Sequence, residues 1–286
     1  MDNKAIDQAR ILSQALPYMQ EYSGKIVVVK YGGNAMINED LMNNVIADVC
    51  LMNMVGIKVV LVHGGGPDIS KALKKVNKES VFVNGLRYTD EETIEIVQEV
   101  LAGKVNKNLV KRIMNGGNKA IGVCGIDNML LEAKKLESED DLGYVGEIKE
   151  VHGEMLLDML DKGYIPVVAS IGMDREGNSY NVNADYAAAA IAENLKAMNL
   201  LMVSDISGLL ANKDDEQSLI RAVTIDEAEE LKQTGVISGG MIPKVDCLIN
   251  ALQGGVERAV IIDGRIPHSI LIEIFSQEGA GTFFSK

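Results

Sequence analysis

Two glycine-rich turns, each directly after a short run of β-branched residues, are the first feature of this sequence that could do chemistry. Gly32-Gly33 follows residues 25–30, and Gly64-Gly65-Gly66 follows residues 58–62. Glycine lets the backbone approach a ligand closely, and the N–H groups of such a turn bind anions. Because the carboxyl ends of parallel strands meet at one edge of a sheet, both turns should open into one crevice and predict a phosphate site.

Neither turn fits a known short fingerprint for nucleotides. The sequence has no G-x-x-x-x-G-K-[ST] and no G-x-G-x-x-G after a strand. Taken singly, each turn is as well explained by a tight connection between a strand and a helix. The missing glycine fingerprint also argues against a dinucleotide-dependent oxidoreductase.

Three charged residues stand where they could act on a phosphate. Lys30 closes the first apolar run beside a Gly-Gly turn, and Lys244 lies just inside a predicted helix start, where the helix dipole disfavours a cation. Asp185 heads another predicted helix. The plain alternatives are a solvent-exposed lysine at a strand end and an acid that complements a helix N-terminus.

An N-terminal helix is predicted over residues 4–21. Its apolar residues recur at steps of three and four, which predicts a stripe on one face: Ile6, Ala9, Leu12, Leu16 and Met19. Pro17 lies inside this pattern, so we expect a kink there or a break near Leu16.

The rest of the chain is typical of an α/β fold with a parallel sheet, because buried-type strands alternate with helical segments. Strands are expected at 25–30, 58–62, 164–170, 200–203 and 259–263, and helices at 39–55, from about 184, near 226–233 and at 241–253. Residues 120–124, 129–136 and 144–151 predict an antiparallel insertion, and residues 172–183 a loop. A domain boundary is expected near residue 197.

Composition and charge limit the possible partners. The chain has 286 residues, which is typical of about two domains, and a formal net charge of −13. That charge repels phosphate backbones, so no nucleic acid partner is expected. No apolar stretch is long enough to span a membrane, no signal-peptide pattern is present, and the three cysteines are widely spaced. These features favour a cytoplasmic protein without disulfides and with no membrane partner.

Six segments together resemble the amino acid kinase family in order and spacing. They are Lys30-Tyr-Gly-Gly-Asn-Ala, Val62-His-Gly-Gly-Gly66, Asn84-Gly-Leu-Arg87, Asn181-Val-Asn-Ala-Asp185, Ser204-Asp-Ile-Ser-Gly-Leu209 and Gly239-Gly-Met-Ile-Pro-Lys244. The resemblance implies a three-layer αβα sandwich with a mainly parallel central sheet, plus the N-terminal helix. It divides the chain into an oligomerisation helix (1–22), an acyl-amino-acid lobe (23–197) and a nucleotide lobe (198–286).

The resemblance also implies a reaction. The segments around Arg87 and Asp185 are most similar to family members that phosphorylate the γ-carboxylate of N-acetyl-L-glutamate with ATP in arginine biosynthesis. Lys30 and Lys244 would then contact the phosphoryl group, Asp185 would hold both lysines, and the N–H groups of Gly33 and Gly65 would cradle the moving phosphoryl.

The same resemblance implies the binding residues. Gly65 and Gly66 would line the acyl-amino-acid pocket, while Arg87 and Asn181 would hold the substrate's α-carboxylate. The nucleotide would meet a set in the second lobe: Asp205, Gly208, Leu209, Leu210 and Lys244. Magnesium would arrive on ATP through the phosphates, and no protein metal ligand is expected.

The attacking carboxylate is ionised at neutral pH, so the reaction needs no general base. His63 is the residue that could be mistaken for one, and a histidine satisfied within its turn is the preferred interpretation. Other readings stay open: a carbamate, aspartate or UMP kinase of the same family, or a non-catalytic amino-acid sensor.

The N-terminal segment and the C-terminal part resemble the arginine-sensitive form of these enzymes. In that form the helices join dimers into a hexamer, a trimer of dimers, and arginine is an inhibitor that binds between the helix and the second lobe. The resemblance implies an arginine site built from Glu273, Gly279, Lys232 and Tyr22.

Overall fold

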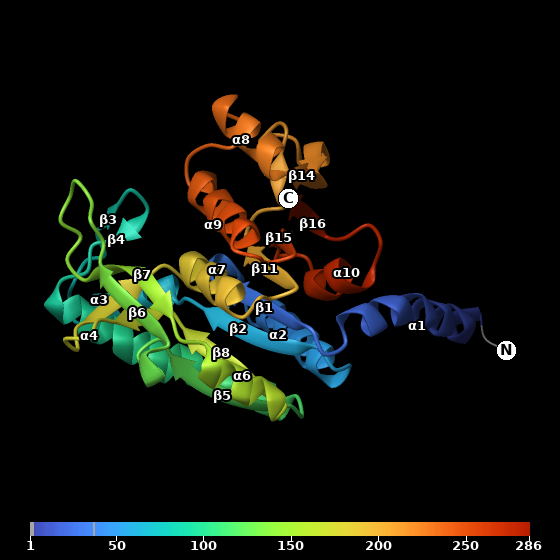
Figure 1. The fold of residues 1–286 in the computed structure, drawn as a ribbon, viewed down its shortest axis with the longest axis horizontal. Helices are drawn as coiled ribbons and strands as arrows, with labels where there is room; N and C mark the ends of the chain where they lie inside the picture. Colours follow the sequence, from blue (N-terminus) through green and yellow to red (C-terminus); the bar gives the residue numbers. More distant parts are fainter. Residues whose placement is uncertain (1–2, 37) are drawn as a thin grey trace.

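A central sheet of eight strands organises the computed structural model, which describes residues 3–36 and 38–286 (Figure 1). The strand order is β14-β16-β15-β11-β1-β2-β8-β5. The bounds are β1 Ile26–Tyr31, β2 Lys58–His63, β5 Lys119–Cys124, β8 Tyr164–Ala169, β11 Asn199–Ser204, β14 Ala222–Thr224, β15 Arg258–Asp263 and β16 Gly281–Ser285. Strands β15, β11, β1, β2, β8 and β5 pair in parallel, and β16 pairs antiparallel with β15.

Helices cover both faces of this sheet. Their bounds are α2 Glu39–Met54, α3 Gly66–Lys75, α4 Glu91–Gln98, α5 Asn106–Asn115, α6 Glu154–Asp161, α7 Ala184–Asn194, α8 Ile225–Gln233, α9 Met241–Gln253 and α10 Ser269–Phe275. A π-helical segment, η2 (Glu99–Val105), joins α4 to α5. The helices predicted at 39–55, from 184, near 226–233 and at 241–253 are confirmed. No helix among the described residues is long and apolar enough to cross a membrane.

Side chains of successive strand residues enter two different cores. In β1, Val27 and Val29 pack with α2, α5 and α10, while Val28 packs with α6, α7 and α9 on the opposite face. Alternation of this kind follows from the two-residue period of a strand. The three-layer αβα sandwich with a mainly parallel sheet is therefore confirmed.

The predicted antiparallel insertion is partly wrong. β6 (Leu131–Lys135) and β7 (Val145–Val151) do pair antiparallel, but β5 lies in the main sheet, parallel to β8. Helices α5 and α6 flank β5 in the chain, and crossovers of this length allow parallel pairing, which local sequence does not reveal.

The segment predicted as a loop also contains strands. β9 (Ile171–Met173) and β10 (Ser179–Val182) form a hairpin that closes a small barrel with β6 and β7. The alternation of polar and apolar residues in Ser179-Tyr-Asn-Val182 is the sequence signal that could have revealed β10, and its side chains are alternately buried in the structure.

A single helix, α1 (Asn3–Tyr22), precedes the sheet and projects from the body (Figure 1). It runs through Pro17 to Tyr22, so of the two alternatives predicted, a kink at Pro17 or a break near Leu16, the break is wrong. The end of α1 is anchored, because the Tyr22 hydroxyl accepts hydrogen bonds from Arg258 (3.2 Å) and Asn199 (3.3 Å). The first two residues of the predicted N-terminal segment lie outside the described residues.

Candidate active site

The carboxyl ends of β1 and β2 carry the two glycine turns, and both turns open into one cavity of about 340 Å³. This shared opening was expected from the parallel arrangement of the two strands. Predicted site residues that line the cavity are Lys30, Gly33, Gly65, Gly66, Arg87 and Asn181. Residues from Lys30 to Ala184 in the chain thus meet at this edge of the sheet.

Asp185 joins the two predicted lysines. Its Oδ1 lies 2.7 Å from Lys30 Nζ, and its Oδ2 accepts a hydrogen bond from Lys244 Nζ at 2.6 Å. Burial alone would raise the pKa of Asp185, but the two ammonium groups outweigh it and hold the pKa at about 2. The carboxylate is therefore ionised at neutral pH and keeps both cations beside the glycine turns.

The helix starts explain how these charges are placed. Asn183 caps α7, since its side chain accepts from the backbone N–H of Asp185. Lys244 lies in the first turn of α9, against the preference of the helix dipole. The negative charge of Asp185 offsets the unfavourable interaction between Lys244 and the helix dipole. The ammonium group of Lys30 lies beside the first glycine turn, since a Cβ built on Gly32 would be 3.4 Å from Lys30 Nζ.

The turn after β2 is packed against η2. A Cβ built on Gly65 would lie 2.6 Å from Leu101 Cδ2 and 3.2 Å from Val105 Cγ2. The backbone can approach η2 this closely only because Gly65 has no side chain. The close approach leaves the start of α3 facing the cavity, where its N–H groups are available to an anion.

Arg87 is presented by a hairpin of β3 (Phe82–Val83) and β4 (Leu86–Arg87). Asn84 and Gly85 both have positive φ, 50° and 82°, as a two-residue type I′ turn requires. The Asn-Gly pair is the sequence signal that could have predicted this hairpin.

The guanidinium of Arg87 is held in position on one side. It donates to Ser80 Oγ (2.6 Å), Ser70 Oγ (3.0 Å) and the carbonyl oxygen of Gly66 (3.0 Å), and it lies 4.7 Å from the ring centre of Phe82. Ser70, Ser80 and Phe82 were not predicted. A guanidinium has five N–H donors, so two remain beyond these three bonds, on a residue that lines the cavity.

Asn181 reaches the same cavity from β10. Its amide nitrogen donates to Thr89 Oγ1 at 3.1 Å, and Thr89 Oγ1 in turn donates to the carbonyl oxygen of Arg87 at 2.8 Å. Thr89 is fully buried. The two residues predicted to hold a carboxylate are therefore linked through one hydroxyl group.

His63, the last residue of β2, is fully buried. Its Nδ1 lies 2.9 Å from the Gly64 carbonyl oxygen and its Nε2 lies 3.1 Å from Asn106 Nδ2. Burial lowers the pKa of His63 to about 4, so the ring is neutral at physiological pH. These contacts agree with the interpretation of a histidine satisfied within its turn.

The predicted nucleotide residues follow β11, the neighbour of β1. Asp205 comes directly after the strand, so it lies at the same edge of the sheet as Lys30. Gly208 has a φ of 131°, and the N–H of Leu209 donates to Thr282 Oγ1 at 2.8 Å. Leu209 and Leu210 form β12, which pairs with β13 (Leu219–Ile220). None of the four lines the 340 Å³ cavity.

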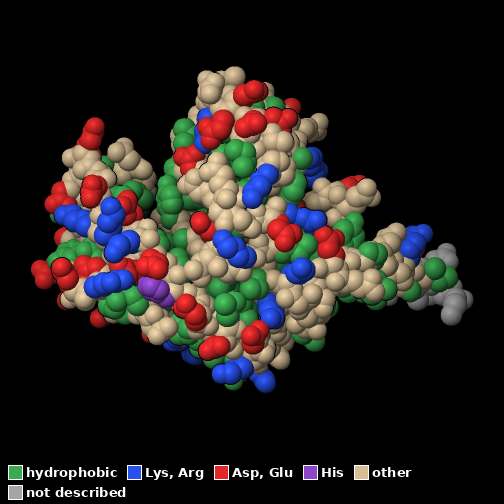
Figure 2. Space-filling view, viewed as in Figure 1, with side chains coloured by type: hydrophobic (Ala, Val, Ile, Leu, Met, Phe, Trp, Pro, Cys, Tyr) green, Lys and Arg blue, Asp and Glu red, His purple; other side chains and the backbone are tan. Residues whose placement is uncertain are grey.

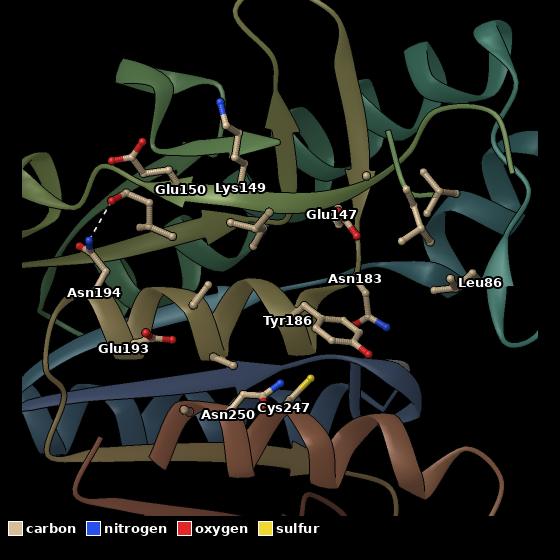
Figure 3. Close-up of a pocket in the computed structure, with 18 of the residues that line it drawn as sticks. Leu86, Glu147, Lys149, Glu150, Asn183, Tyr186, Glu193, Asn194, Cys247 and Asn250 are labelled. Carbon is tan, nitrogen blue, oxygen red and sulfur yellow. Dashed lines mark hydrogen bonds between the residues drawn. The ribbon is translucent and has the colours of Figure 1, made fainter. Parts of the chain in front are cut away.

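A second cavity, of about 870 Å³, separates β7 from α7 and α9 (Figure 3). Figure 3 shows Tyr186 and Asn183 between the β7 side chains and the Cys247–Asn250 turn of α9. It shares Leu86, Val145 and Asn183 with the smaller cavity but is lined by none of the predicted site residues. In the space-filling view the molecule is notched between the β3–β4 hairpin and the α8–α9 end (Figure 2).

The predicted arginine residues fall into two groups. Glu273 Oε2 accepts from the N–H of Ala280 at 2.7 Å, and a Cβ on Gly279 would lie 2.8 Å from that oxygen. Tyr22 ends α1, which packs against α10, the helix of Glu273. Lys232 on α8 instead pairs with Glu229 and with Asp246 of α9. The structure thus brings Glu273 and Gly279 together and directs Lys232 elsewhere.

Few side chains of the kinds that bind metal ions lie at this site in the part of the chain that the structure describes. The carboxylate beside the glycine turns is Asp185, whose two oxygens face the lysines. This donor set fits a magnesium ion that is held by nucleotide phosphates. Among the described residues, a grouping of Glu132, Glu150 and His152 also has ligand atoms within 4.8 Å of one another. Glu132 there already accepts from Lys149 and Arg175.

The class of protein follows from the fold and this edge of the sheet. The model of the amino acid kinase family matches residues 25–263. The chain belongs to the amino acid kinase family.

Relatives within the family are more specific. An acetylglutamate kinase of Brachyspira hyodysenteriae is 54% identical over 280 residues, which cover 98% of this chain and 97% of the relative. An acetylglutamate kinase of Clostridium beijerinckii is 54% identical over 277 residues, with coverage of 96% and 97%.

Solved structures agree on the fold. N-acetylglutamate synthase from Neisseria gonorrhoeae, complexed with coenzyme A and N-acetyl-glutamate, superposes with a TM-score of 0.86 at 25% identity. The match covers 97% of this chain and 63% of the synthase. Carbamate kinase from Giardia lamblia bound to AMP-PNP matches with a TM-score of 0.68 at 17% identity, covering 93% and 99% of the two chains, and shows the shared fold alone.

Proposed function

We propose that this chain transfers the γ-phosphoryl group of ATP to the γ-carboxylate of N-acetyl-L-glutamate. The product is N-acetyl-L-glutamyl 5-phosphate, and the reaction is the second step of arginine biosynthesis, in the cytoplasm. The observation that carries the proposal is the Lys30–Asp185–Lys244 bridge beside two glycine turns that share a cavity with Arg87. The names of the relatives at 54% identity support the same substrate.

The chemistry asks chiefly for positioning and positive charge. Lys30 and Lys244 offset charge on the transferring phosphoryl group, and Asp185 keeps them at a fixed separation. The N–H groups of Gly33 and Gly65 complete the cradle, because donors aimed at developing charge stabilise the transition state more than the ground state.

The substrate end of the cavity selects the acceptor. Arg87 has two N–H donors left for the α-carboxylate, and Asn181, linked to it through Thr89, supplies an amide next to it. Gly65 and Gly66 leave room for the acyl group. Carbamate lacks a second carboxylate, so this guanidinium favours an amino-acid substrate over the carbamate alternative.

The nucleotide belongs in our proposal to residues 198–286. Asp205, Gly208, Leu209 and Leu210 lie beyond β11 and would meet ATP next to Lys244, while residues 23–197 bind the acyl-amino acid. Magnesium bound to the ATP phosphates would neutralise charge between the β- and γ-phosphates. The central sheet contributes strands to both proposed lobes, β1, β2, β5 and β8 to the first and β11, β14, β15 and β16 to the second.

The proposed reaction is tested by ADP release. With MgATP present, N-acetyl-L-glutamate should give ADP, whereas L-glutamate, L-aspartate, carbamate and UMP should give little above the ATP blank. Comparable turnover with one of the other acceptors would identify a different member of the family. No ADP with any acceptor, combined with binding of N-acetyl-L-glutamate, would identify the sensor instead.

Arginine inhibition through a hexamer is part of the proposal. α1 leaves large apolar side chains in solvent, since Ile6, Leu12 and Leu16 are 50%, 67% and 52% exposed (Figure 2). A face of this kind is stable when a partner covers it. Helices from neighbouring dimers are the partner we propose, with arginine bound near Glu273, Gly279 and Tyr22, and with Lys232 as the fourth residue.

Deleting residues 1–20 should leave an active dimer that arginine does not inhibit. The deletion removes the exposed face of α1 but leaves the Tyr22 anchor and the sheet. Glu273→Ala should weaken inhibition while the hexamer stays intact. Analytical ultracentrifugation with and without arginine, together with the ADP assay, checks both results. A full-length protein that sediments as a dimer and ignores millimolar arginine would contradict this part and leave the catalytic proposal standing.

A further inference from the structure

The backbone where β2 ends has hydrogen-bond partners on both sides of the Gly64 residue. The N–H of Gly64 donates to the Tyr31 carbonyl oxygen at 3.3 Å, and the His63 carbonyl oxygen accepts from Ser170 N–H at 3.3 Å. The Gly64 carbonyl oxygen faces the His63 ring at 2.9 Å. Within the described part of the chain, the next N–H, that of Gly65, has no hydrogen-bond acceptor.

Asn106 determines which ring nitrogen of His63 carries the proton. Its Nδ2 lies 2.8 Å and 3.2 Å from the carbonyl oxygens of Val167 and Val123, while its Oδ1 accepts from Lys107 Nζ at 3.0 Å. These partners identify Nδ2 as the donor, with its two protons shared among three acceptors. An amide nitrogen cannot accept, so His63 Nε2, 3.1 Å away, carries no proton. The proton of the neutral ring is therefore on Nδ1, and Nδ1 donates to the Gly64 carbonyl oxygen.

The carbonyl of Gly64 and the N–H of Gly65 belong to one peptide unit. A trans peptide is planar, so its C=O and N–H point in opposite directions. Holding the carbonyl oxygen toward the buried His63 ring turns the N–H away from the core, toward the cavity that Gly65 lines. Gly65 has no side chain that could restrain this peptide, and it flexes easily without an outside contact.

We propose that His63 and Asn106 are positioning residues that fix the Gly64–Gly65 peptide and so aim the Gly65 N–H at the transferring phosphoryl group. The inference rests on the proposed function for its phosphoryl group. Neither side chain touches the substrate. His63 acts through its own neighbouring peptide, and Asn106 acts through the tautomer of His63.

The π-helical segment explains how Asn106 reaches this place. η2 ends at Val105, and its Leu101 and Val105 pack against Gly65, with Leu101 also lining the cavity. Asn106 follows directly as the first residue of α5 and is fully buried. π-Helical turns insert one extra residue in a helix and occur often at functional sites. Here η2 places the side chains of Leu101 and Val105 against Gly65 and also brings the Asn106 amide close to the neighbouring His63.

Proton transfer by His63 is a different role, and the surroundings argue against it. Burial lowers the pKa of His63 to about 4, and the positive charge of Lys107, the titratable group of α5 near the ring, acts in the same direction. A positioning role leaves the pH profile of kcat unchanged when the ring is replaced, whereas a proton-transfer role changes it.

Nuclear magnetic resonance of protein with ¹⁵N-labelled histidine tests the tautomer directly. The chain has three histidines, and a His63→Leu sample identifies the signals of His63. We expect a proton on Nδ1, a bare Nε2 and no titration between pH 5.5 and 8. A proton on Nε2, or titration of His63 in that range, would overturn the proposal. This measurement uses no substrate, so its result is independent of whether N-acetyl-L-glutamate is the acceptor.

Two amide variants separate the two hydrogen bonds of the ring. In His63→Asn the side-chain nitrogen is as many bonds from the backbone as Nδ1, so it can still donate to the Gly64 carbonyl oxygen. In His63→Gln the amide instead takes the place of Nε2 beside Asn106. We expect His63→Asn to keep kcat within ~3-fold, and His63→Gln to lose ~10-fold or more, with both KM values changed less than ~3-fold.

The comparison is made on variants whose far-UV circular dichroism and thermal unfolding match the parent protein. The kcat–pH profile of His63→Asn should have the same shape as that of the parent. Equal kcat in the Gln and Asn variants, or a His63→Asn profile with a lost or shifted limb, would overturn the positioning role. If the parent protein phosphorylates a different acceptor, the same pair of variants is compared with that acceptor.

Discussion

Replacing Lys244 with alanine should lower kcat by ~10²-fold or more, the scale of losing one donor to the transition state. Lys244 Nζ lies 2.6 Å from Asp185 Oδ2, so the variant removes one of the two cations that the buried carboxylate keeps beside the glycine turns. The KM values for ATP and N-acetyl-L-glutamate should change much less, because the charge that the lysine offsets is largest in the transition state. Steady-state kinetics with both substrates varied measures this split.

Lys58→Ala is the matched control for this experiment. Lys58 is the first residue of β2, at the opposite end of that strand from the glycine turn. It pairs with a carboxylate, Asp161, at 2.7 Å, and both side chains are solvent-accessible. A pair of this kind contributes little, so kcat should stay near the parent value. If Lys244→Ala retained a near-normal kcat, Lys244 would have no part in the chemistry.

For Arg87→Ala we expect the KM for N-acetyl-L-glutamate to rise by ~10²-fold, with much less change in the KM for ATP. Hydrogen bonds to a charged partner contribute about 1.5–3 kcal/mol each, and one or two are lost with the α-carboxylate. The guanidinium is already oriented by Ser70 and Ser80, so the parent protein spends little entropy on ordering it.

A rise in KM for Arg87→Ala could come from a disordered β3–β4 hairpin or from the lost positive charge, and two further variants separate these causes. Arg87→Lys keeps a positive charge but lacks the planar fork, and it should also show a raised KM for the acyl substrate. Arg175→Ala, which removes a mostly exposed arginine paired with Glu132, is the control and should leave both KM values unchanged. Parallel changes in the two KM values of Arg87→Ala, or a change for ATP alone, would remove Arg87 from the acceptor site.

Local pattern was enough to predict much of the sheet. The apolar runs that became β1 and β2 and the glycines after them appear within short windows, and the capping residue Asn183 before α7 is equally local. The place of β5 was not predictable in this way, because parallel pairing with β8 depends on a partner some 45 residues away in the chain.

In the candidate active site too, some residues could be predicted from the sequence and others could not. Lys30, Asp185 and Lys244 were selected from residue type, position and family resemblance, and the structure brings them within hydrogen-bonding distance. Ser70, Ser80 and Asn106 carry no such signal, since serines and asparagines are common on any helix or loop. Their positions matter only through the atoms that folding places beside them.

Sequence by itself determined the strands, the glycine turns and the charges of this protein, because β-propensity, backbone freedom at glycine and ionisation are properties of residues and their near neighbours. The tertiary structure supplied the distances at which one carboxylate meets two lysines, a contact that the family resemblance had implied but no local pattern shows. It alone placed Asn106 beside His63. Those contacts depend on the parallel sheet and on η2, which join chain segments separated by tens of residues. A hydrogen bond is specified by distance and direction, and neither is written in the order of the residues.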